Sequence, residues 1–418
     1  MAPISLGILA ASGSGQSLNW ILVYPSGTFT DRNYVFPAGT TGPNLRMYDN
    51  LSTGTLFEVD PFGEILWART TGMDGNALTN GIGMGDSLTT YWVVHDDPSV
   101  IRFAEMNYNA YSMSRQINTG FSSPGGLGIT VVPSGIYVSG HNGDEPYAWI
   151  GKFGLDGSTS WQKTVRGTST TRYTLFYENA VDESTGDVFA GGYNETVNRG
   201  WIGKFNSSGS LQWMREFRDP SASDTSYDVR GLMISSDNNL LMVVKRGQTN
   251  YLVKMDFSGS IIWQVMMLEN QYNSAEIYED SAGNIWLLTD DSSGPQQKPT
   301  AMKFSSTGTL LLQRQFGVDG YSGGGFSFTL DNDGLNYVIG ARGPDATHYA
   351  KLPRDGSKTG NYVVDGKTYN YTTGSVSTAA GNLTTATPTT TVATVNFSNS
   401  ASYPALTTIT PTTILKGI

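Results

Sequence analysis

The sequence contains no cysteine among its 418 residues. Disulfide bridges, zinc sites built on thiolates and thiol nucleophiles are therefore excluded. No run of eighteen apolar residues occurs, so neither a membrane-spanning helix nor membrane insertion is expected. Charge is also scarce, because charged residues make up 15% of the chain and the net charge is −10. An acidic chain with few clustered lysines and arginines is not expected to bind nucleic acid.

Long helical stretches rich in alanine, glutamate, lysine and leucine are missing too. The abundant residue types favour strands and turns instead: there are 50 glycines, 22 tyrosines, 17 phenylalanines and 9 tryptophans. Aromatic residues are enriched in strands, and glycine allows the backbone angles that tight turns need. This composition predicts an all-β protein.

One hairpin can be built from residues 201–217, WIGKFNSSGSLQWMREF. Its Asn-Ser-Ser-Gly centre predicts a type I turn that the glycine closes in the left-handed region. A bulge after this turn is expected to place Phe205 opposite Leu211 and Gly203 opposite Trp213, so that the glycine leaves room for the indole. The alternation of apolar residues is that of a strand and not of a helix.

The turn glycine of this hairpin recurs about every fifty residues, with aromatic residues on both sides. It is found at Gly63, Gly157, Gly209, Gly259, Gly308 and Gly356, and Asn107 takes the place of one missing copy. Four residues before it lie Phe153, Phe205 and Phe304, and four residues after it lie Trp67, Tyr111, Trp161, Trp213 and Trp263. We predict that these are structural repeat residues and that the tryptophans are buried between neighbouring units.

A second strand pair is predicted between successive hairpins, where short apolar runs such as IYVSG (136–140) recur. Four strands in about fifty residues is the period of a propeller blade. We therefore expect an all-β, seven-bladed β-propeller over residues 18–368, with six or eight blades as alternatives. To close the ring, residues 33–39 are predicted to share a sheet with residues 348–364.

The segments AWIGKFGLDGSTSWQKTV (148–165) and WIGKFNSSGSLQW (201–213) resemble the short propeller repeats of many secreted and surface bacterial proteins. They are also similar to the tryptophan-bearing blades of quinoprotein dehydrogenases and of outer-membrane assembly propellers. The resemblance implies an architecture but no particular activity. Quinoproteins hold their cofactor on a tryptophan floor with calcium-binding carboxylates and often a vicinal cysteine pair. Since cysteine is absent here, we expect no cofactor.

The two ends of the chain, residues 1–17 and 369–418, are predicted to lie outside the propeller. The opening peptide MAPISLGILAASGSG resembles one common in structural proteins of tailed bacteriophages, notably those of marine bacteria and cyanobacteria. The resemblance implies an arm that anchors the protein to a particle, with Ile4, Leu6, Ile8 and Leu9 buried on a partner. A signal peptide is the alternative, but the first basic residue is Arg32.

The C-terminal extension is rich in threonine and resembles phage fibre and virion proteins in composition. Residues 389–397 and 406–415 alternate β-branched and polar residues as strands do. Because such a segment cannot bury a core alone, we expect it to add strands to a neighbouring chain. Simple disorder is the other interpretation.

No catalytic, cofactor-binding or metal-ligating residue is predicted. Five lysines recur five residues before the turn glycine, and they are expected to pack along the blades with their ammonium groups in solvent. They are Lys152, Lys204, Lys254, Lys303 and Lys351. A charged rim for an anionic ligand is the alternative. The sequences DESTG (182–186), DSAG (280–283) and DNDG (331–334) predict blade turns rather than calcium loops. We expect the three histidines to be surface or loop residues and not metal ligands. They are His95, His141 and His348.

Together these observations favour a non-enzymatic structural or adhesion protein of a phage particle. The propeller would be exposed, as a tail fibre, head fibre or capsid decoration, and would be anchored by its ends to other virion proteins or to copies of itself. A host-surface glycan is a candidate ligand, because aromatic faces stack on sugars. The alternatives are a secreted or periplasmic propeller that serves as a binding scaffold and, less favoured, a quinoprotein-like enzyme.

Overall fold

A computed structural model of the chain describes residues 4–5, 20–24, 33–37, 45–49, 55–61, 65–70, 81–84, 91–97, 100–106, 111–119, 124–141, 146–167, 173–195, 197–220, 226–247, 249–268, 276–291, 297–331, 334–342, 347–364, 366–395, 397–401, 407–409, 413–414 and 416–417. The chain divides into two compact units. Unit 1 comprises residues 1–75, 268–378 and 406–418, and unit 2 comprises residues 76–267 and 379–405.

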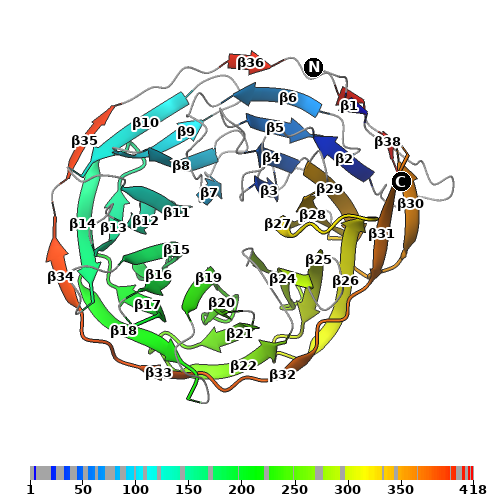
Figure 1. The fold of residues 1–418 in the computed structure, drawn as a ribbon. Helices are drawn as coiled ribbons and strands as arrows, with labels where there is room; N and C mark the ends of the chain where they lie inside the picture. The colour runs from blue at the N-terminus through cyan, green and yellow to red at the C-terminus, as the bar shows by residue number, and fades with distance from the viewer. Residues whose placement is uncertain are drawn as a thin grey trace. The chain divides into compact units, whose positions relative to one another are not determined.

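Unit 2 contains sheets of one repeated design. In each, four strands follow one another in chain order, pair antiparallel, and are joined at the far edge by a strand of the C-terminal tail (Figure 1). The four sheets are β7 (Gly81–Met84), β8 (Tyr91–Asp97), β9 (Val100–Met106) and β10 (Tyr111–Asn118) with β35 (Ser398–Ala401); β11 (Gly125–Val132), β12 (Gly135–His141), β13 (Ala148–Phe153) and β14 (Thr159–Arg166) with β34 (Thr391–Thr394); β15 (Thr174–Asp182), β16 (Asp187–Asn194), β17 (Arg199–Phe205) and β18 (Leu211–Arg218) with β33 (Thr384–Ala386); and β19 (Tyr227–Ile234), β20 (Leu240–Arg246), β21 (Thr249–Met255) and β22 (Ile261–Met267) with β32 (Thr378–Ala380).

Unit 1 repeats the design with two variations. Its sheets are β3 (Asn33–Pro37), β4 (Leu45–Asp49), β5 (Thr55–Val59) and β6 (Ile65–Thr70) with β36 (Thr407–Ile409); β23 (Ile277–Glu279), β24 (Ile285–Asp291), β25 (Lys298–Phe304) and β26 (Leu310–Val318) with β31 (Lys367–Thr373) and β30 (Gly360–Val364); β27 (Gly325–Leu330), β28 (Asn336–Arg342) and β29 (Thr347–Pro353) with β2 (Trp20–Tyr24) and β38 (Lys416–Gly417); and the pair β1 (Ile4–Ser5) and β37 (Thr413–Ile414).

These four-stranded antiparallel sheets are propeller blades, and they confirm the predicted all-β propeller. Among the residues that the model describes there is no helix, and so none able to cross a membrane. The count of seven blades in one ring stays a prediction.

The predicted closing strand is wrong. Asn33–Pro37 pairs with β4, its neighbour in the chain, whereas the strand that joins β29 is Trp20–Tyr24, with Leu22 opposite Tyr349. The predicted hairpin over residues 348–364 is also divided, because β30 pairs with β31 beside β26. Pairing β3 with β4 closes a short loop, so it costs less conformational entropy than pairing β3 with the distant β29. The earlier apolar strand WILVY (β2) then completes the sheet of β29.

The predicted register of the hairpin over residues 201–217 is right at the turn and wrong by one residue beyond it. Phe205 lies opposite Leu211, but the bulge falls between Lys204 and Phe205, so that Trp213 lies opposite Lys204 and Met214 opposite Gly203. A Cβ atom on Gly203 would lie 2.8 Å from the Met214 methyl group. The glycine therefore leaves room for the methionine and not for the indole.

Large aromatic side chains of the third strands lie in the core. Trp149, Trp201 and Tyr251 occupy equivalent places on β13, β17 and β21, and all three are fully buried. Phe153, Phe205 and Phe304, which were predicted from the repeat, are fully buried as well. Each large aromatic side chain removed from water in this way stabilises the fold by about 3 kcal/mol.

The C-terminal tail forms strands, as predicted, but they pair with sheets of their own chain. β33, β34 and β35 pair antiparallel with β18, β14 and β10, and β36 does so with β6. Figure 1 shows the orange-to-red tail along the last strand of these sheets. The expectation that residues 389–415 extend a neighbouring chain is thus corrected for β34 and β36, because open sheet edges within the same chain are available at no cost of association.

The N-terminal arm is described only at Ile4–Ser5, which pairs in parallel with Thr413–Ile414. Leu6, Ile8 and Leu9, predicted as anchoring residues, lie outside the described residues, and the side-chain burial predicted for Ile4 is not tested. Anchoring by the arm stays a prediction.

Candidate functional site

Four of the five recurring lysines of the third strands form ion pairs with aspartates in or directly after the turns between the first and second strands. Lys204 lies 2.8 Å from Asp187, Lys254 lies 2.6 Å from Asp237, Lys303 lies 3.3 Å from Asp280, and Lys351 pairs with Asp331. The side chains of Lys254 and Lys351 are only 7% and 3% exposed. For these four lysines the prediction that the ammonium groups point into solvent is wrong, because an aspartate carboxylate lies beside each of them. The Lys152 ammonium instead lies 5.2 Å from the centre of the Tyr137 ring.

Two of these aspartates are held firmly in the ionised form. Burial acts to raise the pKa of Asp280, but hydrogen bonds from Trp286 and Asn284 and the charge of Lys303 outweigh it and set this pKa at about 2. At Asp237 burial is likewise outweighed, by bonds from Lys254, Ser235 and Asn239, and the pKa is again about 2. Such carboxylates stay charged at neutral pH and serve the fold rather than proton transfer.

The hairpin tryptophans contact the next sheet, but they are half-buried and not fully buried as predicted. The indole N–H of Trp161 donates to the Ser207 carbonyl at 3.0 Å, and that of Trp213 donates to the Phe257 carbonyl at 3.0 Å. Trp67 instead donates to Glu58 of its own sheet, at 3.2 Å. Trp263 is also half-buried, and Tyr111 begins β10. The indole N–H groups of Trp161 and Trp213 lie over a surface turn of the next sheet, and one edge of each of these two rings stays in water.

One of the three histidines predicted to be surface or loop residues is buried. His348 is fully buried in β29, and its Nδ1 lies 2.9 Å from the hydroxyl of Tyr369 in β31. His141 is half-buried at the end of β12, and only the backbone of His95 is described, in β8. In the part of the chain that is described, no group of three or more histidine, aspartate or glutamate side chains could hold a metal ion.

A recurring glutamine receives the C-terminal tail, a feature that was not predicted from the sequence. The backbone carbonyls of Gln162, Gln264 and Gln313 accept hydrogen bonds from Val395, Gly381 and Gly374, at 3.2, 3.3 and 3.4 Å. Two residues further along the tail, the Phe397 and Leu383 carbonyls accept from the side-chain amides of Gln162 and Gln264, at 3.1 and 2.9 Å. The Trp-Gln dipeptides at 161–162 and 263–264 were the available signal, whereas Gln313 follows a leucine.

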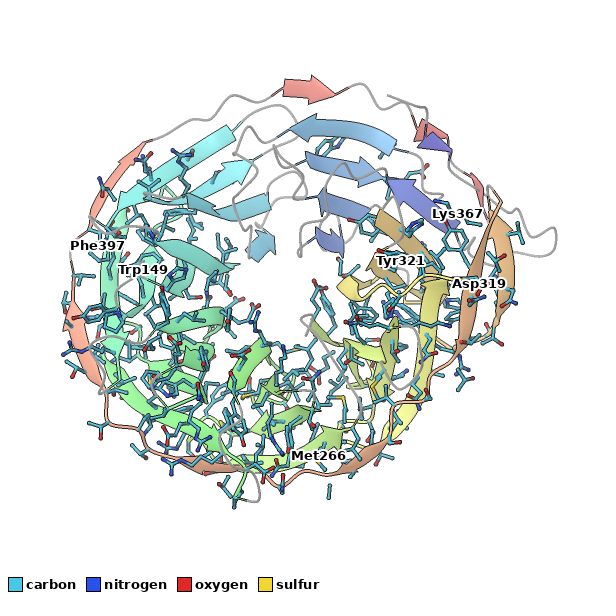
Figure 2. The ribbon with its side chains drawn as sticks, in the orientation of Figure 1. Trp149, Met266, Asp319, Tyr321, Lys367 and Phe397 are labelled. Atoms are coloured by element: carbon cyan, nitrogen blue, oxygen red, sulfur yellow. The ribbon has the colours of Figure 1, made fainter. Side chains whose placement is uncertain are left out.

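Apolar side chains of the tail, close to these hydrogen bonds in the sequence, pack into the sheets. Val376 and Leu383 are 2% and 3% exposed, and Phe397 packs against the cluster that contains Trp149 (Figure 2). The tail is therefore part of the folded core and not only an added edge.

A groove of about 500 Å³ opens in unit 1 between the sheet of β23–β26 and the sheet of β27–β29. Two turns form its walls, residues 280–284 and 334–336, and residues 353–358 close one side. Its charged lining residues are Asp280, Lys303, Arg354, Asp355 and Lys358, and its apolar ones are Ala282, Leu335 and Pro353. Leu335 is 61% exposed. A concave surface that combines charged groups with exposed apolar ones is suited to a small polar ligand.

The side chains around the groove are held in place by their own sheets. Arg354 donates from Nε to the Asn336 carbonyl at 2.7 Å and from its terminal nitrogen to the Asp331 carbonyl. The Lys303 ammonium lies 5.0 Å from the centre of the buried Trp286 ring, whose N–H donates to Asp280 at 3.1 Å. Fixed groups of this kind lose little conformational entropy when a ligand binds.

No family model matches the chain, and no curated protein matches its sequence. Among solved structures, hydrazine synthase of Kuenenia stuttgartiensis is 10% identical, with a TM-score of 0.53, covering 76% of this chain and 95% of that chain. The Swd1 β-propeller domain of Myceliophteria thermophila is 9% identical (TM-score 0.49, covering 79% and 99%), and the Dos1 propeller is 9% identical (TM-score 0.45, covering 79% and 96%). At these identities the likeness concerns the fold alone.

Proposed function

We propose that the protein is a non-enzymatic structural and adhesion protein of a phage particle, and that its propeller is the exposed body. The observation that carries the proposal is the cover of the sheet edges by the tail. An open edge strand is a template for association with other copies, and particles display many copies close together. Tail strands of two to four residues pair with part of the outer edge strand of their sheets: β33 covers Glu216–Arg218 of β18, and β34 covers Lys163–Arg166 of β14.

The recurring polar residues support a structural role as well. The lysines at the repeat position are ion-paired, and the tryptophans and glutamines connect sheets or hold the tail. Side chains used in this way are committed to the fold. The opening peptide supports anchoring through the N-terminal arm to other virion proteins, with tail fibre, head fibre and capsid decoration as the candidate positions.

The test is to purify particles from a culture in which the gene is expressed and to search their proteins by mass spectrometry. We expect the full chain, with an intact Met1 end, in stoichiometric amounts. A variant with Leu6→Asp and Leu9→Asp should leave the propeller folded and be lost from particles, whereas Val197→Asp, at an exposed position, should be retained. Detection only in the medium or periplasm, cleaved near Ala11, would support the secreted binding scaffold instead.

A further inference from the structure

One sheet of unit 1 has a strand beyond the place where the tail joins the other sheets. In the sheet of β23–β26, the strand next to β26 is β31, and β30 pairs with β31 on its outer side. Figure 1 shows β30 and β31 side by side, with β30 outside β31. β30 is therefore the edge strand of this sheet on the tail side.

The sequence explains how this additional strand forms. β30 and β31 are separated by two residues, Asp-Gly, a pair that is favoured in tight hairpin turns. Gly366 has a φ of 74°, which glycine adopts without strain. Along β30 the side chains alternate, because Tyr362 packs partly against the core whereas Asn361 and Val363 are exposed. The strand thus presents one amide and one apolar side chain to solvent on the same face.

The edge of β30 lacks the features that usually protect an edge strand. The other sheets end on the tail side in strands of two to four residues. β30 has five residues and contains neither a charged residue nor a proline. Val363 is 66% exposed, more than any other large apolar side chain in the described residues. Because soluble proteins blunt their edges with short strands, charges or prolines, an edge without them indicates a partner that covers it.

The strands of the chain itself are already used elsewhere. β32 to β36 and β38 each pair with a different sheet, and β37 pairs with β1. Within the residues that the structure describes, no further tail strand remains to cover β30. A second copy of the chain, however, offers the same free edge. We therefore propose that β30 is a contact between two copies of this chain, which pair antiparallel through this strand.

Pairing of β30 with itself is compatible with two-fold symmetry. With the two Tyr362 residues opposite each other, Asn361 of one copy lies opposite Val363 of the other copy. Residues that lie directly opposite in an antiparallel pair point to the same face and contact each other. The exposed valine of each copy is then partly covered by the other copy, and the sheet continues from one copy into the next. The same surface serves in both copies, as a two-fold contact requires.

The size of this contact determines where it acts. Stable interfaces bury about 1,200–2,000 Å² in total, and one pair of five-residue strands is well below this range. The pairing is therefore weak in dilute solution and becomes effective where copies are held close together. On a particle it would connect neighbouring propellers. The contact itself goes beyond the proposed function, because it can be measured with the purified chain alone.

The absence of cysteine makes cross-linking a direct test, because one introduced thiol is the only one in the chain. The full chain with Val363→Cys is treated with a short bismaleimide at increasing protein concentration. We expect covalent dimers whose yield rises with concentration. Val197→Cys, at a valine that is 41% exposed in unit 2, is the matched control and should yield several times less dimer. Equal yields in the two variants, or no dimer in either, would overturn the inference.

Sedimentation velocity tests the same contact without a cross-linker. We expect the wild-type chain to self-associate at high concentration. Val363→Lys should remove the association, because it places a charge on the edge and repels the same charge of the other copy. Thr391→Lys, which adds the same charge at an exposed position of β34, should keep it. Loss in both variants, or in neither, would contradict pairing through β30.

The particle test separates this contact from the proposed function. A chain that is present in particles but stays monomeric in solution keeps the proposed function and loses this contact. If the Val363→Cys thiol in particles cross-links only to a different virion protein, the edge belongs to that partner and the inference is overturned.

Discussion

Gln264 holds Leu383 by two hydrogen bonds: its side-chain N–H donates to the Leu383 carbonyl at 2.9 Å, and the Leu383 N–H donates to its side-chain oxygen at 3.0 Å. One amide side chain thus satisfies both polar groups of a tail residue, as a neighbouring strand would. The tail is bound to its sheets through side chains that recur with the blades.

Replacing this glutamine is expected to loosen the tail. Gln264→Ala removes both hydrogen bonds and should destabilise the tail by about 1–2 kcal/mol. Hydrogen exchange measured by mass spectrometry should show faster exchange in the segment around Leu383. Gln212→Ala, which alters an exposed glutamine that bonds only to Ser210, is the matched control. Unchanged exchange in Gln264→Ala would contradict the proposed clamp.

The half-buried tryptophans are expected to stabilise the contact between sheets. Trp213→Ala should lower the free energy of unfolding by about 3 kcal/mol, at the lower end of the range for such truncations, because part of the indole is already in water. Trp213→Phe should cost about 1 kcal/mol, chiefly for the bond to the Phe257 carbonyl. Thermal unfolding measures both, and a Trp213→Ala protein that melts like the wild type would refute this role.

The buried contact between β29 and β31 gives a third prediction. Tyr369→Phe removes the hydroxyl that lies 2.9 Å from Nδ1 of His348 and should destabilise the protein by about 1–3 kcal/mol. Denaturant unfolding provides the measurement. Tyr173→Phe, at a ring that is 46% exposed, should change the stability by less than about 0.5 kcal/mol. If both variants unfold alike, the buried hydroxyl contributes nothing.

Acid should weaken the fold through Asp280. Its pKa is about 2 in the folded chain and about 3.9 in an unfolded one, so the folded state favours the ionised form. The resulting stability, about 1–2 kcal/mol, is fully present above about pH 4 and is lost as the pH falls towards 2. Asp280→Asn should flatten the dependence of the unfolding free energy on pH in this window. If the slope of unfolding free energy against pH is unchanged in Asp280→Asn, other carboxylates cause the loss of stability in acid.

The repeat could be recognised from the sequence because its turns and aromatic residues are local features. The turn glycine at Gly209, with φ of 78°, and the pairing of Phe205 with Leu211 follow from residue types alone. The bulge position does not, since a shift of one residue keeps the turn intact and changes only which side chain meets Lys204.

Pairings between strands that are distant in the sequence were harder to predict than the local hairpins. Several apolar runs near the N-terminus could complete the sheet of β29. In the tail, the alternation of threonine with apolar residues predicts strands, but it does not reveal whether they pair with sheets of the same chain or of another chain. The groove was equally hidden. Its lining residues come from turns of two sheets, and the sequence does not show that the Arg354 side chain turns back to bond the Asn336 carbonyl of its own sheet.

The position of the tail in the sequence also determines when its strand pairs can form during synthesis. A ribosome makes β10 long before β35, since Asn118 ends the one and Ser398 begins the other, and their pairing must wait for the residues between them. At about 5–20 residues per second this delay is on the order of tens of seconds. The sheet of β15–β18 waits for a shorter time, because its partner β33 is made before β35. Every nascent chain therefore carries open strand edges until the tail has been made, and a product that ends before residue 367 keeps them. Translation errors that shorten this protein should yield its most aggregation-prone forms.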